Sequence, residues 1–189
     1  MHGDIWHVNL RASRMAQQTI ALHPGWNLVS TRLEATDRSI DNVLRTALGS
    51  IVRVLSLDCE DGALSYYPDL PPGLNSLREI DARHGYWVDA NGHILLVVSG
   101  VEVPADMPLP LCSGFNQVSY LPSTALPVAE ALQSIAGSFD AVFGFDSTLG
   151  ALSYYADLPP ALNSLHQLEP GHGYWLKMKE PATLVYPGP

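Results

Sequence analysis

Basic residues are scarce in this sequence. The 189 residues include 10 Lys and Arg against 19 Asp and Glu, which gives a formal net charge of −9. Proteins that bind nucleic acids depend on basic side chains to neutralise phosphates, so this composition argues against a nucleic-acid partner. Long apolar runs are missing as well, and none reaches the roughly 20 residues that a transmembrane helix requires. We therefore expect no insertion into a membrane.

Cysteine is almost absent, with Cys59 and Cys112 as the only two. The sequence repeat described below aligns Cys59 with Ser147 and Cys112 with His23, so the two cysteines are not equivalent. A disulfide that belongs to a repeated unit would recur in each copy. We therefore expect two free thiols, and the alternative is a single bridge between the units.

What the sequence does contain is an internal repeat. The segment 63–77 returns as 151–165 with thirteen of its fifteen residues identical, at an offset of 88. The tetrapeptide His-Gly-Tyr-Trp follows each copy at the same offset, at 84–87 and 172–175. Self-similarity at a fixed offset indicates one structural unit used twice, so we predict a tandem duplication. The expected division is an N-terminal extension at 1–18, a first module at 19–103 and a second module at 104–189.

Short alternating runs bounded by Gly and Pro predict a small antiparallel sheet in each module. One hairpin is expected from 51–58 and 63–69, with its counterpart in the second module. A closing hairpin is expected at 85–99, because Asn91-Gly92 is the strongest two-residue hairpin signal. Before the first module, Ile5 to Leu10 would make an added edge strand, and 11–18 a linker or loose helix.

One helix per module is expected beside this sheet. Apolar residues recur at helical spacing between Ile40 and Leu48 and again between Val128 and Ala136. Ser39 is a plausible N-cap, and Gly49 stands where a helix would end. Strands and helix together predict an α+β fold, a tandem duplication in which each unit is a small antiparallel sheet with one helix.

The repeated segment continues into a loop without regular periodicity. Leu70, Leu74 and Leu77 are expected to anchor this loop in the core despite its prolines. Asn75 and Asn163 are expected to hydrogen-bond loop backbone that no sheet can satisfy.

The opening of the first module, Pro24-Gly-Trp-Asn-Leu-Val-Ser30, is followed by a short helix, a hairpin and Gly85-Tyr-Trp-Val88. This pattern resembles a module found, often in tandem, in bacterial secreted and cell-surface proteins. The resemblance covers about 19–100 and, more weakly, 108–189, where Ser113-Gly-Phe-Asn-Gln-Val-Ser119 replaces the tryptophan version. It implies an accessory, non-catalytic unit of an exported protein, and it transfers no catalytic residues.

Two alternatives follow for localisation. The first seven residues lack the basic segment and apolar run of a secretory signal peptide, which leaves the cytoplasm or a segment of a longer exported chain. The resemblance implies the extracellular space or the cell surface, and this is our expectation.

A hydrolase is the alternative to a non-catalytic module. Each module carries the residue types of a nucleophile, a base and an orienting carboxylate, but no Gly-x-Ser-x-Gly turn supports the serines. The candidate residues are Ser65, Asp69, Ser76 and His84, and Ser153, Asp157, Ser164 and His172 in the second module. An acidic turn at Asp58, Glu60 and Asp61 offers oxygen ligands for calcium, but a solvated turn is the expected role. We expect no enzyme, no metal and no cofactor.

The aromatic residues are the most informative candidates for binding. Neighbouring residues of a strand face opposite sides, so Tyr66 is expected in the core and Tyr67 outside. If Trp87 shares the outer face, the rings form a platform for a glycan or protein ligand. The rival hypothesis is that the rings are buried or scattered and form no site. The candidate site residues are Tyr67, Asp69, His84 and Trp87, with Tyr155, Asp157, His172 and Trp175 in the second module.

Overall fold

The structure is a computed structural model that describes residues 15–59 and 61–188. Strands make up 47% of it and helices 12%, in five antiparallel sheets. The protein is therefore mainly β, and the prediction of an α+β fold with one helix per unit is wrong. In the described ranges, no helix is long and apolar enough to cross a membrane.

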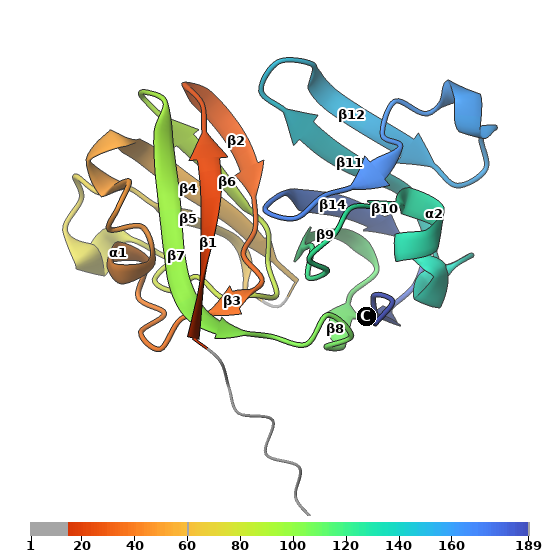
Figure 1. Ribbon diagram of the computed structural model, residues 1–189, viewed down its shortest axis with the longest axis horizontal. Coiled ribbons are helices and arrows are strands. Elements are labelled where there is room, and N and C mark those ends of the chain that lie inside the picture. Colours follow the sequence, from red (N-terminus) through yellow and green to blue (C-terminus); the bar gives the residue numbers. More distant parts are fainter. Residues whose placement is uncertain (1–14, 60, 189) are drawn as a thin grey trace, which may run out of the picture.

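The first half of the chain contains two sheets that share one core (Figure 1). The sheet orders are β2-β6-β4-β5 and β1-β7-β3. The strands are β1 (Met15–Leu22), β2 (Gly25–Val29), β3 (Leu33–Glu34), β4 (Ile51–Asp58), β5 (Gly62–Tyr66), β6 (Tyr86–Ala90) and β7 (Ile94–Glu102). The helical turns are α1 (Ile40–Val43), η1 (Leu48–Ser50) and η2 (Pro72–Leu74).

The second half repeats this arrangement with shorter outer strands. Its sheet orders are β12-β11-β14-β9, β15-β8 and β10-β13. The strands are β8 (Leu109–Leu111), β9 (Gly114–Ser119), β10 (Leu126–Pro127), β11 (Phe139–Asp146), β12 (Gly150–Tyr155), β13 (Gln167–Leu168), β14 (Gly173–Met178) and β15 (Ala182–Leu184). The helical turns are α2 (Val128–Ala131), η3 (Gln133–Ile135) and η4 (Pro160–Leu162). A second core cluster fills this half.

The expected helices shrink to single turns. Ile40, Val43, Leu44 and Ala47 are buried, as their spacing predicted. Beyond Val43, however, the chain continues through turns and η1, and Ser39 makes no side-chain cap hydrogen bond. A short segment gains little from helix propagation, so successive turns packed on the sheet bury the same apolar residues.

A corner replaces the expected closing hairpin. The chain bends at 23–24, between β1 and β2, and again at 91–93, between β6 and β7. On one side of these two bends β1 pairs with β7, and on the other side β2 pairs with β6. One long ladder thus passes from one sheet into the other, as strands do at the corners of orthogonal packings. The hairpin prediction at Asn91-Gly92 is wrong because β6 and β7 pair with other strands and not with each other. The predicted β4–β5 hairpin is confirmed.

The repeated segment forms an edge strand and the loop that covers it. β5 lies at the edge of its sheet, and the loop that follows returns along it. Asn75 Oδ1 accepts a hydrogen bond from Tyr67 N at 2.9 Å, and Asn75 Nδ2 donates to Tyr67 O. Asn163 makes the same two bonds to Tyr155, so the prediction for both asparagines is confirmed. Covering an edge shields backbone groups that would otherwise pair with another chain.

Only one of the three leucines expected to anchor this loop does so. Leu77 is 4% exposed, whereas Leu70 is 42% and Leu74 is 70% exposed. Leu74 closes the 3-10 turn η2, which directs its side chain outward. The anchoring prediction is therefore wrong for Leu70 and Leu74.

The two halves lie side by side (Figure 1) and meet at a contact that we call the seam. Its contacts are reciprocal, which indicates an approximate two-fold axis between the halves. Val29 forms a β-bridge with His172, and the equivalent Val118 forms one with His84. Contacts of β2 with β11 and β14, and of β4 with β9, complete the seam. The halves are thus joined by two isolated β-bridges rather than by a shared sheet.

Two glycines at the centre of the seam explain the repeated His-Gly-Tyr-Trp motif. A Cβ atom on Gly173 would lie 2.7 Å from Val29 O and 3.1 Å from Gly85 Cα. A Cβ atom on Gly85 would lie 2.9 Å from Val118 O. Any larger residue at either place would push the two halves apart.

A disulfide joins Cys59 to Cys112 across the seam, with a Cα–Cα distance of 6.1 Å. It connects the β4–β5 turn of the first half to the β8–β9 corner of the second. The prediction of two free thiols is therefore wrong. The bond joins one half to the other, and each half supplies one of its two cysteines. It therefore need not occur a second time within the repeat.

The amino-terminal predictions differ in outcome. The structure begins with β1 at Met15, so the expected linker or loose helix is wrong for 15–18. The expected edge strand from Ile5 to Leu10 lies outside the described residues.

Candidate functional site

The seam contains two cavities at equivalent positions. One has a volume of about 250 Å³, and we call it the open seam cavity; it is lined by His23, Leu28, Phe145, Asp146, Ser147 and His172, among others. The other has about 240 Å³, and we call it the bridged seam cavity; its lining includes Leu57, Asp58, Cys59, His84 and Gln117. Because of the two-fold arrangement, residues of one cavity have counterparts in the other.

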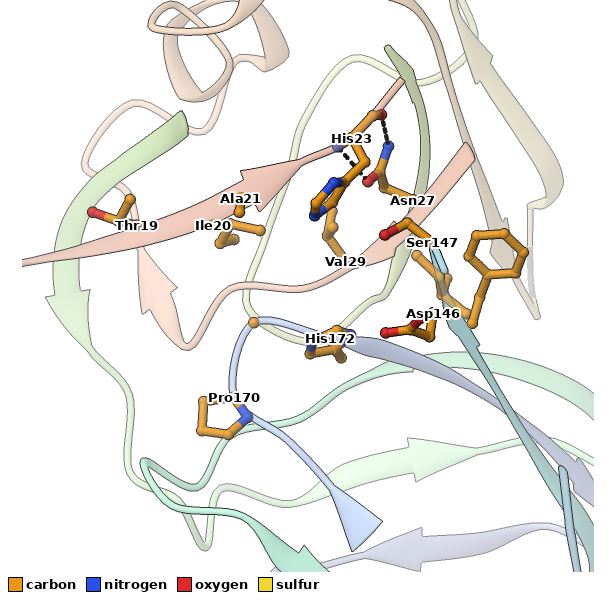
Figure 2. Close-up of a pocket in the computed structure, with 13 residues that line it drawn as sticks. Thr19, Ile20, Ala21, His23, Asn27, Val29, Asp146, Ser147, Pro170 and His172 are labelled. Carbon is orange, nitrogen blue, oxygen red and sulfur yellow. Dashed lines mark hydrogen bonds between the residues drawn. The ribbon is translucent and has the colours of Figure 1, made fainter. Parts of the chain in front are cut away.

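The open seam cavity has polar residues where the other cavity has the disulfide. His23 and Ser147 occupy the positions of Cys112 and Cys59. Figure 2 shows the carboxylate of Asp146 directed toward the ring of His172. Backbone N–H groups at 148 and 149 lower the pKa of Asp146, and the nearby histidines lower it further. Asp146 therefore places an ionised carboxylate in the open seam cavity at neutral pH.

Asn27 holds the corner that carries His23. Its Nδ2 donates to His23 O at 2.8 Å and its Oδ1 accepts from His23 N at 2.9 Å (Figure 2). Asn116 makes the same pair of bonds to Cys112. The asparagine in each module opening, Asn27 and Asn116, thus fixes the corner residue that follows the outer strand at the seam.

In the bridged seam cavity, His84 lies between two carboxylates. Its Nδ1 is 2.9 Å from Asp81 Oδ1 and its Nε2 is 3.2 Å from Asp58 Oδ2. The hydrogen bond to Asp81 raises the pKa of His84. Burial alone would raise the pKa of Asp81, but His84 and two backbone N–H groups hold it at about 2. His84 therefore pairs with two carboxylates of its own half beside the seam.

The residues of the hydrolase alternative do not form one constellation. Both ring nitrogens of His84 face carboxylates of Asp81 and Asp58, neither of which was among the candidates. Ser76 Oγ instead accepts a hydrogen bond from Ser65 N at 2.8 Å, as part of the covered sheet edge. In the second half, Ser164 binds Ser153 in the same way, and His172 Nε2 lies 3.9 Å from Glu169 Oε2. Asp69 and Asp157 are exposed.

The structure does not gather metal ligands in its described part. No three His, Cys, Asp or Glu side chains there are placed to hold an ion. In the acidic turn, Asp58 lies beside His84, and Glu60 lies outside the described residues.

The first half separates the aromatic residues expected to form its platform. Tyr66 is buried, as expected, and Tyr67 is half-buried rather than fully exposed. In the sheet, β4 lies between β5, which ends just before Tyr67, and β6, which carries Trp87. Trp87 instead contacts Trp26 in its own half at 6.0 Å, and Phe145 across the seam at 5.1 Å, between ring centroids. Tyr67 and Trp87 therefore do not form one surface.

The second half carries a continuous row of four rings on the outer face of its four-stranded sheet. Centroid distances are 5.9 Å from Tyr155 to Phe143, 6.4 Å from Phe143 to Phe115 and 5.8 Å from Phe115 to Trp175. Phe115 is 47% and Tyr155 is 41% exposed. We call these residues the aromatic row. It contains the predicted Tyr155 and Trp175.

Sequence reasoning missed the two phenylalanines at the centre of the aromatic row. Phe143 lies on the strand that separates the outer rings, where the first half has Leu55. The available signal for Phe143 was its alternation with the buried Val142 along β11, which places Phe143 on the outer face.

No family model, curated protein or solved structure matches this chain. Function is therefore inferred from the geometry of the site itself.

Proposed function

We propose that this protein is a non-catalytic binding module that recognises a glycan through the aromatic row. The observation that carries this proposal is the contact of four successive rings across one sheet face, with two of them more than 40% exposed. Rigid aromatic rings offer contact area at low entropic cost, and the faces of sugar rings are apolar enough to pack on them. A row of this kind suits an extended ligand better than a compact one.

The disulfide supports an extracellular or cell-surface location for this module. Disulfides persist in oxidising compartments and are rare in the reducing cytosol. Cys59 is exposed and Cys112 half-buried, so the bond would be open to cytosolic reductants. An exported chain, or a segment of a longer one, is the setting in which this seam stays bridged.

The test is binding of the whole chain to an array that carries both glycans and peptides. Phe115→Ala should weaken retention by about tenfold, the effect of losing one aromatic contact of roughly 1.4 kcal/mol. The melting temperature should change little, because Phe115 is 47% exposed. Leu74→Ala is the matched control, since Leu74 is also exposed and lies in the other half.

Three outcomes would contradict the proposal. These are retention of wild-type affinity by Phe115→Ala, equal loss in Leu74→Ala, and binding of the wild type to peptides alone. Tyr155→Ala provides an independent check at the other end of the row.

A further inference from the structure

The bridged seam cavity already contains a carboxamide that satisfies a backbone group. Gln117 Oε1 accepts a hydrogen bond of 2.9 Å from Leu57 N. The pairing of β4 with β6 ends at Leu55, so β6 supplies no acceptor at Leu57. Gln117 is only 2% exposed, which places this contact inside the seam. A side-chain amide of one half therefore caps a strand end of the other half.

The open seam cavity has the corresponding strand end without the amide. Phe145 is the counterpart of Leu57, and both lie opposite an alanine in the same register of their hairpins. Pairing of β11 with β14 ends at Phe143. Because Leu57 donates its N–H away from β5 to Gln117, the same register implies that the N–H of Phe145 faces away from β12, on the side of the cavity that Phe145 lines. The counterpart of Gln117 is Leu28, a side chain without an acceptor.

The remaining lining of the open seam cavity suits a small neutral ligand with hydroxyl groups. Asp146 accepts backbone hydrogen bonds through Oδ1 and brings a second carboxylate oxygen to the mouth, beside His172 and Ser147. A carboxylate disfavours an anionic ligand, whereas hydroxyl groups donate readily to it. Leu28 and Val29 line the cavity with little exposed surface, 2% and 8%, which suits an apolar group no larger than a methyl. The volume of about 250 Å³ suits a single sugar residue rather than a chain, because sites for drug-sized ligands measure about 300–1,000 Å³.

We propose that the open seam cavity binds one N-acetylated hexosamine. The acetamido oxygen accepts from Phe145 N, as Gln117 Oε1 accepts from Leu57 N in the bridged cavity. The acetyl methyl group packs on Leu28, and the sugar hydroxyls donate to Asp146. This site is separate from the aromatic row, so either proposal can fail without the other.

The test is a titration of the whole oxidised chain, followed by amide NMR, with N-acetylglucosamine, glucose and N-acetylalaninamide as separate probes. The Phe145 amide resonance should shift with N-acetylglucosamine. Glucose lacks the acetamido group and N-acetylalaninamide lacks the hydroxyls, so each should bind at least about tenfold more weakly. A Phe145 resonance that does not move, or equal binding of either control probe, would overturn the assignment.

Leu28→Gln tests the same idea from the protein side. The introduced carboxamide should occupy the acceptor position, as Gln117 does in the other cavity, and abolish binding of N-acetylglucosamine. Gln117→Leu is the matched control and should leave that binding unchanged. A Leu28→Gln protein that binds like the wild type would refute the proposal.

Asp146→Asn keeps the assay decisive if Leu28→Gln does not fold. Asparagine retains an oxygen to accept the two turn hydrogen bonds but loses the charged acceptor, so affinity should fall about tenfold. Unchanged affinity in this variant would also count against the site. Phe115→Ala, which removes part of the aromatic row, should leave the titration unaffected.

Discussion

Removal of the disulfide should destabilise the protein mainly through its unfolded state. The bond closes a loop with a sequence separation of 53 residues. The chain-entropy relation for a loop of that length gives about 14 cal/mol/K, or about 4 kcal/mol at 25 °C. Cys59 is exposed and Cys112 half-buried, so replacing both with serine removes little packing. We expect the double variant to lose about 3–4 kcal/mol in free energy of unfolding.

The assay is urea denaturation followed by tryptophan fluorescence, with and without reductant. Reductant should destabilise the wild type by the same amount as the double substitution and should not affect the variant. The denaturant dependence should also steepen, because the unbridged unfolded chain exposes more surface. A thiol titration of the unfolded wild type without reductant should find none.

Two results would refute this reasoning. Two titratable thiols would show that the bridge is absent. A loss below about 1 kcal/mol with an intact bridge would show that the seam holds the two halves together even in the unfolded reference state.

Two further predictions concern the seam. His23→Cys combined with Ser147→Cys should form a second disulfide in oxidising conditions, because these positions are the counterparts of the native cysteines. Mass spectrometry of the peptide map would detect this bond. Persistent free thiols at the two introduced cysteines would contradict the two-fold arrangement. His84→Gln should lower the free energy of unfolding most between about pH 4 and 6.5. The raised pKa of His84 gives a stabilising contribution that is complete below the ordinary value of 6.5 and is lost as the pH rises through the folded value. The lowered pKa of Asp81 gives a second stabilising contribution, which is lost as the pH falls toward about 2. A difference in stability between His84→Gln and the wild type that stays flat across pH in urea melts would contradict the contribution of the two ion pairs of His84.

The sequence by itself determined the features that depend on neighbouring residues. Alternation along a strand predicted that Tyr66 faces the core and that the 51–58 segment forms a hairpin with the next strand. The asparagines of the repeated loop were predictable because an irregular segment must satisfy its own backbone groups. These are short-range consequences of backbone geometry.

The tertiary structure alone decided which strands became partners. The Asn91-Gly92 signal fits a hairpin as well as a corner, and only pairing with residues 57 to 86 positions away selects the corner. Strand order likewise separated Tyr67 from Trp87 in the first half, while Phe143 joined the outer rings in the second.

The disulfide and the two cavities also lie beyond what a single repeat can reveal. Cys59 and Cys112 have no counterparts in the repeat, and this made a bond between them look improbable from the sequence. The bond exists because the halves pack face to face around a two-fold axis, which brings non-equivalent positions of the repeat together across the seam. Local periodicity carries no information about that axis, because the bridges that create it join residues 34 and 143 positions apart.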